Sequence, residues 1–310
     1  MKVQVVSITF CFSLAVSAFN LNTTVCPRKA VPPSVLNFGF LDDGIPRDLH
    51  EFPPVLLNVN NVHVFDDKAG SGAQAELYTG RLLHTDEDVV VKVFDGAPLE
   101  SIMHEATLMT YLQGVPHVPR FHGLLPMGPD ILDLGIVMEY IPNGTTMYDL
   151  LLLGMLPDCD WINIAQQLST ALLEMHKRYV LFNDLHDKNI VVSWHGPMPM
   201  VYVVDFGDAT FRKGNSFMQN FTQGPGNPFP SPEAHFGITT PASDVYSLGI
   251  IMAHIADYVN NKSFYTTIQQ CLASDPNDRL PLYNLNDFLV DLYESTCMKT
   301  SAIWDYQLRS

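Results

Sequence analysis

The chain has 310 residues, of which 47% are hydrophobic and 16% are charged, and its formal net charge is −16. This composition is typical of a well-packed globular protein and argues against a disordered chain. Because so acidic a protein repels phosphate groups, we expect neither nucleic acid nor an anionic membrane surface to be a partner.

The first 18 residues have the features of a secretory signal peptide. A single lysine precedes an apolar run that extends to Ala18, and the tripeptide that ends at Ala18 fits the small-residue rule for cleavage. An uncleaved membrane anchor is the alternative, although the run is slightly short for a bilayer span. We expect cleavage, no stable membrane span after it, and a protein that is secreted or stays in the ER or Golgi lumen.

Cysteines and glycosylation sequons agree with a secretory route. The cysteines beyond the signal segment permit up to two disulfides in any of three pairings; they are Cys26, Cys159, Cys271 and Cys297. Cys271 lies in an apolar helical pattern, so an ordinary buried thiol is its alternative role. Asn-x-Ser/Thr sequons predict a glycoprotein and occur at Asn22, Asn143, Asn220 and Asn261.

The predicted elements begin with strands. Residues 19–60 are rich in Pro and Asn without a sustained period, which predicts an N-terminal extension, either a tail or an irregular wrap over a later domain. Residues 62–94 predict three strands, and residues 99–112 predict a helix with one apolar face. Two further strands, near residues 120–125 and 136–140, complete a small sheet.

The second half of the chain is predicted to be mostly helical. Residues 161–180 have the apolar spacing of a core helix, and residues 242–259 are apolar almost all round, which indicates a helix buried at the centre of a lobe. The expected fold class is α+β with two lobes. A small β-rich N-lobe is predicted at residues 61–141, a mainly helical C-lobe at 142–298 and a tail at 299–310.

A glycine-rich turn, Gly70-Ser71-Gly72, lies between the first two predicted strands. Small residues there allow backbone N–H groups to approach phosphate oxygens closely. A plain hairpin that binds nothing is the alternative, because such turns are common.

Lys92 follows three consecutive valines in the third predicted strand. An unpaired buried ammonium group is costly, so a lysine there needs an anionic partner. Glu105, on the helix that follows, is the natural candidate. The alternative is a lysine on an edge strand that extends into water.

Asp184, Asn189 and Asp205 complete the set of candidate chemical groups. The stretch "FNDLHDKN" places Asp184 and Asn189 five residues apart, and Asp205 follows a second apolar strand. Carboxylate and amide oxygens suit a Mg²⁺ ion that bridges phosphates, so Asn189 and Asp205 are the candidate metal ligands. Asp184 is then left to orient or accept the proton of an attacking hydroxyl.

In this order, the motifs resemble those of the eukaryotic protein kinase family over residues 62–295. Ser231-Pro232-Glu233 is similar to the family's Ala-Pro-Glu, and residues 244–249 are similar to the start of its central helix. Arg279 resembles the arginine that pairs with the glutamate of Ala-Pro-Glu. The resemblance implies a two-lobed kinase fold, with ATP and Mg²⁺ or Mn²⁺ as cofactors and a protein as the substrate.

The resemblance also assigns roles. It implies that Lys92, held by Glu105, binds the α- and β-phosphates, that Asp205 and Asn189 hold metal ions, and that Asp184 is the catalytic base. The implied cofactor-binding positions are Gly70, Ser71, Gly72, Leu77, Val90, Lys92, Met138, Glu139, Ile141 and Val191. Leu77 and Val90 would sandwich the adenine, Met138 is at the gatekeeper position, and the backbone of Glu139 and Ile141 would face the ring.

Some positions depart from the family's pattern. Phe182 replaces a histidine and is expected to pack under Phe206. Asn183 replaces the arginine that reads activation-loop phosphorylation, which implies a non-RD kinase that is not switched that way. His186 stands where serine/threonine kinases carry Lys, and Lys188 where tyrosine kinases carry Arg, so the acceptor hydroxyl stays open. Most protein kinases carry an extra substrate-docking helix after the central helix. Here the central helix is expected to end near Tyr258, and the short stretch before the helix that carries Cys271 leaves little room for it.

Two other functions stay open. A nucleotide-binding pseudokinase that acts as a binding module would explain Phe182, Asn183 and the bulky Val90, whereas retention of all five groups of the ATP–metal site favours an active enzyme. A small-molecule kinase is the third candidate, because the Asp184 loop also resembles those of aminoglycoside and choline kinases. The pair of Glu233 and Arg279 favours a protein kinase over that candidate.

Overall fold

The computed structural model describes residues 46, 48–71, 75–128, 133–154, 156–212 and 229–298. The chain divides into two compact units, residues 1–35 and 36–310, and all described residues belong to the second. The predicted signal peptide, Cys26, Gly72, the sequons at Asn22 and Asn220, and the tail at 299–310 lie outside the described residues. The domain boundaries drawn from the sequence therefore stay predictions.

The first half of the described chain is an antiparallel sheet with strand order β1-β2-β3-β5-β4. Its strands are β1 (Val62–Ser71), β2 (Ala75–Leu82), β3 (Glu87–Phe94), β4 (Phe121–Pro126) and β5 (Leu134–Glu139). Successive side chains of a strand point to opposite faces. Val89 and Val91 are therefore buried in a small core on one face, while Lys92 points to the other.

Helix α2 (Leu99–Tyr111) contacts strands β4 and β5 of this sheet. Its buried residues recur at helical spacing and include Ile102, Glu105, Ala106 and Met109. All but Glu105 are apolar and join the main core. The helix thus places one carboxylate among apolar side chains, on the side of the sheet to which Lys92 points.

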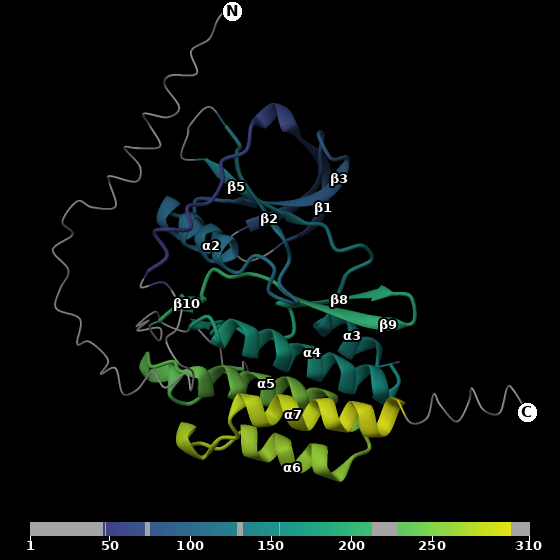
Figure 1. Cartoon of the computed structure of the whole chain (residues 1–310). Helices are drawn as coiled ribbons and strands as arrows, with labels where there is room; N and C mark the ends of the chain where they lie inside the picture. The colour runs from purple at the N-terminus through teal and green to yellow at the C-terminus, as the bar shows by residue number, and fades with distance from the viewer. Residues whose placement is uncertain are drawn as a thin grey trace, which may run out of the picture. The chain divides into compact units, whose positions relative to one another are not determined.

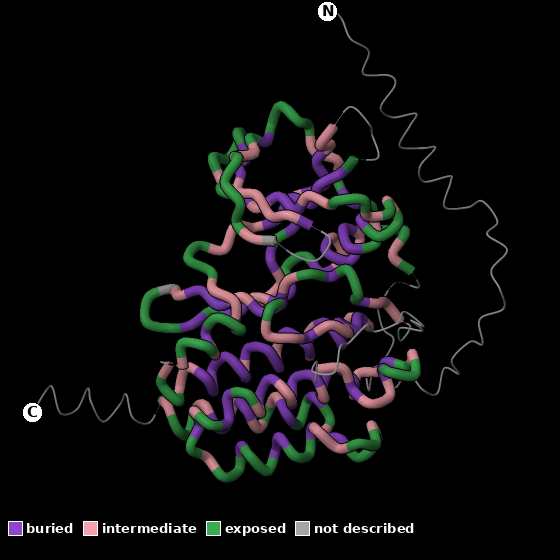
Figure 2. The backbone as a smooth tube through the Cα atoms, turned by 180° about the vertical axis from the view of Figure 1, so that it is seen from behind, coloured by how far each residue is buried: buried purple, intermediate pink, exposed green. Residues whose placement is uncertain are grey.

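The second half is mostly helical (Figure 1). Its α-helices are α3 (Met147–Leu153), α4 (Asp158–His176), α5 (Pro241–Ile255), α6 (Lys262–Cys271) and α7 (Leu282–Tyr293). Short 3-10 turns are η2 (Val59–Asn61), ahead of β1, then η3 (Ala234–Phe236), η4 (Ala256–Tyr258) and η5 (Pro276–Asp278), and a π turn, η6 (Glu294–Met298), follows α7. Helices α4, α5 and α7 contact one another, and Figure 2 shows buried residues concentrated along them.

Two small antiparallel ladders lie in the second half of the described chain. One is β6 (Thr145–Thr146), β8 (Ile190–His195) and β9 (Met198–Val203), and the other pairs β7 (Val180–Leu181) with β10 (Thr210–Phe211). The β8–β9 hairpin leads directly to Asp205. The expected α+β class, with a strand-rich half followed by a helical half, is confirmed.

Helix α5 is buried, as its all-round apolar pattern predicts. Thr240 and Ser243 form a capping box at its start, and Pro241 occupies the first turn, where its missing N–H costs nothing. Gly249 lets α6 approach closely, because a Cβ atom there would lie 2.8 Å from the Cβ of Cys271. The thiol of Cys271 is free and buried, and burial raises its pKa to about 12. This agrees with its role as an ordinary core thiol.

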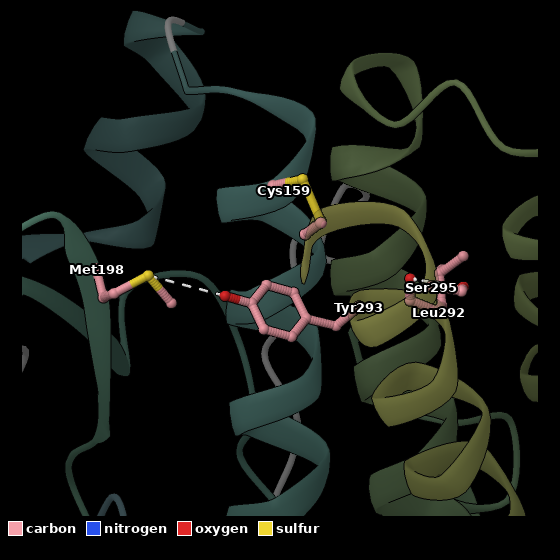
Figure 3. Close-up of a disulfide and its surroundings, with 6 residues drawn as sticks. Cys159, Met198, Leu292, Tyr293 and Ser295 are labelled. Carbon is pink, nitrogen blue, oxygen red and sulfur yellow. Dashed lines mark hydrogen bonds between the residues drawn. A yellow bond between two sulfur atoms is a disulfide. The ribbon is translucent and has the colours of Figure 1, made fainter. Parts of the chain in front are cut away.

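One disulfide is formed in the described part of the chain, between Cys159 in the first turn of α4 and Cys297 in η6 (Figure 3). Its two cysteines are 138 residues apart in sequence. Beside it, the hydroxyl of Tyr293 lies 3.7 Å from the sulfur of Met198 in β9. The chain end after α7 is therefore tied to the start of α4. No helix among the described residues is both long and apolar enough to cross a bilayer.

Candidate active site

Lys92 and Glu105 form the buried centre of the site. The Nζ atom of Lys92 donates to both carboxylate oxygens of Glu105, at 2.8 and 2.9 Å. Strand β3 is hydrogen-bonded on both sides, because Lys92 pairs with Leu77 of β2 and with Ile136 of β5. The lysine is therefore not on an edge strand, and the alternative that it extends into water is wrong.

Asp205 is a second anionic neighbour of Lys92, with Oδ1 3.0 Å from Nζ. Burial would lower the pKa of Lys92, but the carboxylates of Glu105 and Asp205 more than offset it, and the pKa is raised above 10.5. Burial raises the pKa of Glu105, an effect that the nearby ammonium group of Lys92 opposes. Since each charge stabilises the other, we treat the pair as ionised at neutral pH.

Asp184 and Asn189 lie together, as their spacing predicts. The side-chain amide of Asn189 donates to Oδ2 of Asp184 at 2.9 Å and to its backbone carbonyl at 3.1 Å. The N–H of Val204 donates to the carbonyl of Asn189 at 2.9 Å, which joins this loop to the strand that leads to Asp205. With its N–H atoms so used, the side-chain oxygen of Asn189 remains as an acceptor.

The backbone is strained at two positions of the site. Asn183 and Asp205 have φ angles of +66° and +69°, in the left-handed region that non-glycine residues rarely adopt. The surroundings hold both in place. Asp244 of α5 accepts hydrogen bonds from the backbone N–H of Asn183 at 2.8 Å, and the N–H of Gly207 donates to Asp205 Oδ1 at 3.3 Å. Strain that is held in this way is common at functional sites.

Phe182 packs under Phe206, which confirms the expected role of this aromatic substitution. The two rings meet edge to face with their centroids 5.5 Å apart, and both side chains are fully buried. Asn183 makes different contacts: its side-chain amide donates to the carbonyl of Asp208 at 2.8 Å and to the hydroxyl of Thr210 at 3.0 Å. The loop thus contacts the segment after Asp205 through neutral hydrogen bonds.

His176 is a buried polar residue that the sequence did not single out. Its Nε2 lies 2.8 Å from Oδ2 of Asp244, which also accepts the backbone N–H of Phe182 at 2.9 Å. The one signal in the sequence is Asp244 itself, a carboxylate in an otherwise apolar helix that needs partners. Its partner is 68 residues away in the chain, so no local pattern identifies it.

His186 and Lys188 follow Asp184 in the same loop. His186 Nε2 lies 3.5 Å from Asp184 and its Nδ1 lies 3.8 Å from Asp187. Burial lowers the pKa of His186, but the nearby carboxylates of Asp184 and Asp187 outweigh it and raise the pKa to about 9. Lys188 is exposed, and its Nζ lies 5.2 Å from the ring centroid of Tyr148 in α3.

The positions expected to contact adenine lie on β2, β3, β5 and β8 and, for Ile141, just after β5. Met138 is buried in β5, opposite Val90 of β3, and Leu77 and Val90 are half-buried on neighbouring strands. Val191 is half-buried in β8. The N–H of Glu139 donates to the carbonyl of Arg120 at 2.8 Å, whereas the N–H of Ile141 donates to no other described residue. Ile141 is thus the better placed of the two to donate to a ring nitrogen.

The glycine-rich turn is only partly described. Gly70 is half-buried in β1, and a Cβ atom there would lie 3.5 Å from Leu77, so a side chain would stand against an expected adenine contact. The backbone of Ser71 continues β1, and Gly72 lies outside the described residues.

The donor set fits a divalent cation. Asn189 and Asp205 offer an amide oxygen and a carboxylate, which are hard ligands of the kind that Mg²⁺ prefers. Within the described residues, no group of three or more His, Cys, Asp or Glu side chains is arranged to hold a metal ion. A cation here would therefore complete its coordination with phosphate oxygens and water.

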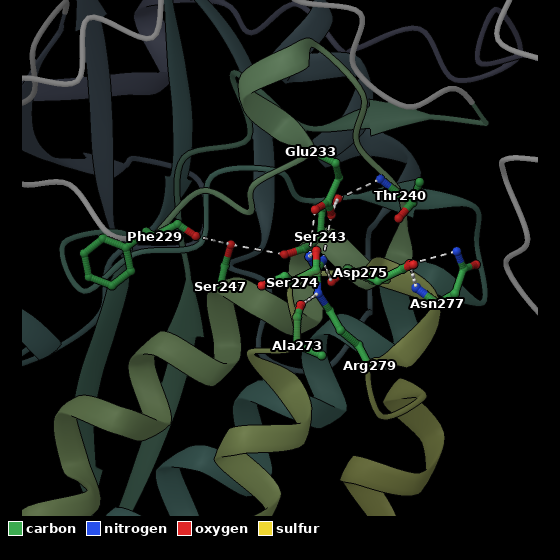
Figure 4. Close-up of polar contacts among 11 residues, drawn as sticks. Phe229, Glu233, Thr240, Ser243, Ser247, Ala273, Ser274, Asp275, Asn277 and Arg279 are labelled. Atoms are coloured by element: carbon green, nitrogen blue, oxygen red, sulfur yellow. Dashed lines mark hydrogen bonds and ion pairs between the residues drawn. The ribbon is translucent and has the colours of Figure 1, made fainter.

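The predicted pair of Glu233 and Arg279 is formed away from these groups (Figure 4). Two guanidinium nitrogens of Arg279 donate to the two carboxylate oxygens of Glu233, at 2.6 and 2.7 Å. The hydroxyl of Ser243 donates to the same carboxylate at 2.8 Å. The arginine side chain is fully buried. The pair joins the segment before η3 to the loop between α6 and α7.

The sequence is similar to those of known protein kinases. The sequence model of the protein kinase domain family matches residues 64–265. A probable serine/threonine-protein kinase of Dictyostelium discoideum is 31% identical over 217 residues, 65% of this chain and 9% of that protein. The tyrosine-protein kinase abl-1 of Caenorhabditis elegans is 27% identical over 204 residues, 63% of this chain and 16% of that protein.

A third relative covers more of the chain. The serine/threonine-protein kinase RUNKEL of Arabidopsis thaliana is 26% identical over 252 residues, 79% of this chain and 18% of that protein. The chain thus spans less than a fifth of the length of each of these three relatives.

Proposed function

The chain belongs to the protein kinase family, and from this premise we propose that it transfers the γ-phosphoryl group of ATP to a hydroxyl group of a protein. The observation that carries the proposal is the joint placement of five groups. Lys92 bonds both Glu105 and Asp205, and Asn189 bonds Asp184. Phosphoryl transfer relies mainly on positioning and charge stabilisation, which these groups are suited to supply.

The roles follow from charge and position. Lys92, kept cationic by two carboxylates, would bind the α- and β-phosphates. Asn189 and Asp205 would hold Mg²⁺ or Mn²⁺, which when bound neutralises phosphate charge. Asp184 keeps one carboxylate oxygen directed at Asn189, and its other oxygen would orient the acceptor hydroxyl and take its proton. Whether that hydroxyl belongs to Ser, Thr or Tyr stays open.

We further propose that activity does not depend on phosphorylation of the segment after Asp205. In many kinases a loop arginine must pair with such a phosphate. Here Asn183 occupies that position and donates to Asp208 and Thr210 without any added charge. The segment is also held by the pairing of β10 with β7.

The proposed location is the secretory pathway, either outside the cell or in the ER or Golgi lumen. The disulfide between Cys159 and Cys297 supports an oxidising compartment. The sequon asparagine Asn143 is exposed, whereas the side chain of Asn261 caps helix α6 by accepting the N–H of Phe264 at 3.0 Å. Peptide mapping of protein from a eukaryotic host tests this: a glycan at Asn143 and loss of residues 1–18 are expected.

An ATP-transfer assay on the secreted protein tests the activity. With Mg²⁺ or Mn²⁺, the wild type should phosphorylate a protein panel, Asp184→Ala and Lys92→Ala should not, and the exposed Asp257→Ala should serve as a matched control. A thermal shift with ATP and metal but no transfer would favour the pseudokinase. Transfer only to small alcohols or amines would favour a small-molecule kinase, and no shift would refute the site.

A further inference from the structure

A segment ahead of the sheet is attached to strand β4. Pro46 and residues 48–57, here called the brace, precede η2 (Figure 1). The N–H of Leu124 donates to the carbonyl of Val55, and the N–H of Leu57 donates to the carbonyl of Leu124, both at 2.7 Å. Leu56 forms a parallel bridge with Leu124. Residues 55–57 of the brace therefore run beside β4.

Gly123 has the backbone conformation and the space that this attachment needs. Its φ angle is +148°, and a Cβ atom there would lie 2.7 Å from the carbonyl oxygen of Val55 and from Cγ of Leu57. Any side chain at this position would collide with the brace. The local sequence of β4 is thus matched to a segment more than 60 residues earlier in the chain.

The brace also contacts the end of α2. The ring of Phe52 meets the ring of Tyr111, the last residue of α2, edge to face at a centroid distance of 4.9 Å. The phenol of Tyr111 donates to the carbonyl of Arg178 at 3.2 Å. Leu49 and Leu56 of the brace are partly buried against the main core. The brace therefore packs against the C-terminal end of α2.

A third contact reaches the segment after Asp205. Tyr111 packs edge to face on Phe211 of β10 at 5.3 Å, so Phe52, Tyr111 and Phe211 form a chain of three rings. Nε of Arg212 donates to the carbonyl of Pro46 at 2.7 Å. The same guanidinium group lies over the ring of Tyr179, 4.6 Å from its centroid. The brace thus contacts α2 through Phe52 and the residue that follows β10 through Pro46.

These two elements lie close in sequence to the partners of Lys92. Helix α2 carries Glu105, and β10 begins five residues after Asp205. A further contact couples them, because His104 Nε2 lies 2.8 Å from the carbonyl of Ala209. At its N-terminal end α2 has no side-chain cap. Its position therefore depends on packing, and the ring contacts at Tyr111 contribute to that packing at the C-terminal end of the helix.

We propose that the brace is a positioning element for the site: by holding Tyr111 and Phe211 together, it keeps Glu105 and Asp205 in reach of Lys92. The proposal rests on the proposed function only in that Lys92 binds nucleotide phosphates. Phe52 is the central positioning residue of the brace, because its ring packs on Tyr111, which in turn packs on Phe211. The expected consequence is that nucleotide affinity depends on a side chain outside the nucleotide site.

The test uses the full chain with Phe52→Ala, and with Val55→Ala as the matched control. Val55 lies in the same segment, but its side chain is 61% exposed. A fluorescent ATP analogue with Mg²⁺ should bind Phe52→Ala about fivefold more weakly, the effect of one aromatic pair. Phe52→Tyr should restore the affinity, and Val55→Ala should match the wild type. Equal affinity in Phe52→Ala and the wild type would overturn the proposal.

A double-mutant cycle separates positioning from general stability. In a Glu105→Gln background, adding Phe52→Ala should have little further effect on affinity, since the contact through which the brace acts is already weakened. An equal loss in both backgrounds would show that Phe52 acts elsewhere and would refute the proposal. If Phe52→Ala does not fold, Phe52→Leu, which keeps most of the apolar volume, takes its place in the cycle.

Hydrogen exchange gives a readout that needs neither transfer nor nucleotide. Phe52→Ala should speed exchange in residues 99–111 and 205–212 and leave α6 and α7 unchanged. Faster exchange throughout, or unchanged exchange at α2, would contradict the brace. If the wild type binds nucleotide but transfers nothing, or binds none, the proposed function fails while the exchange comparison still decides the brace.

Discussion

Lys92 of strand β3 donates to both carboxylate oxygens of Glu105 in helix α2, at 2.8 and 2.9 Å. The two residues are 13 positions apart in the sequence. Both side chains are buried. A buried ion pair of this kind is a weak source of stability, because desolvation of the two charges offsets their attraction. Its value here is positional, since it directs the ammonium group toward Asp205.

The first prediction concerns this pair. Glu105→Gln should lower kcat/KM for ATP-dependent transfer by about 100-fold, because Lys92 loses its charged partner and with it a fixed position. Asp88→Asn is the matched control: Asp88 lies on the same strand and pairs with Arg81 in the open. An exposed pair contributes little, so this variant should behave like the wild type. Equal activity of the two variants would contradict the prediction.

The second prediction concerns Asp184. Asp184→Asn keeps the size of the side chain but removes the proton acceptor, and should reduce kcat by about 10³-fold while leaving the KM for ATP within about twofold. Steady-state kinetics over a range of ATP concentrations measure the two constants. A similar fall of kcat in Asp187→Asn would show that the effect is not specific to Asp184.

The third prediction is a pH dependence of stability. Burial would raise the pKa of Glu233, but the hydrogen bonds from Arg279 outweigh it and hold the pKa below its ordinary value of 4.5. The folded state then binds fewer protons than the unfolded state, so the ionised carboxylate stabilises the fold above about pH 5. This contribution is lost as the pH falls through the lowered pKa.

Chemical denaturation of the wild type and Glu233→Gln, at several values between about pH 3 and 7, checks the sign. The variant should be less stable at neutral pH, by about 3–5 kcal/mol, because Arg279 is left buried without its partner. Its free energy of unfolding should also fall less as the pH is lowered. Parallel pH profiles would contradict the assignment.

The fourth prediction concerns the disulfide. The double variant Cys159→Ser and Cys297→Ser should lose about 2–5 kcal/mol of unfolding free energy, because its unfolded chain is no longer restrained by a long covalent loop. Denaturant unfolding under oxidising conditions measures the loss, and the wild type under reducing conditions should show the same midpoint as the variant. A midpoint equal to that of the oxidised wild type would mean that the disulfide contributes nothing.

The fifth prediction concerns Phe182. Phe182→Ala should cost about 3–5 kcal/mol, because it leaves a cavity beneath the fully buried ring of Phe206. Phe182→Leu retains much of the volume and should cost about 1.5 kcal/mol or less. Thermal unfolding of both variants tests whether this position mainly contributes packing. Loss of transfer in a Phe182→Leu protein that remains folded would instead indicate a direct role in chemistry.

The sequence by itself determined the kinds of element and the chemical groups of the site. Val89-Val90-Val91 reads as a strand and residues 242–259 as a buried helix because both signals are local, set by which side chains recur on one face. The spacing of Asp184 and Asn189 is likewise local, since a five-residue loop brings its own ends together. A lysine within an apolar strand requires an anionic partner because an unpaired buried ammonium group is costly, and Glu105 on the following helix was the natural candidate.

Only the tertiary structure decided which distant groups meet. Cys159 pairs with Cys297, His176 with Asp244, and Phe52 with Tyr111, each across 59 or more residues. The sequence alone is compatible with three pairings of the four cysteines. It also does not distinguish His176 or Phe52 from other residues on the buried face of an element. Such contacts depend on how whole helices and strands pack against one another, and a short-range sequence pattern does not predict that packing.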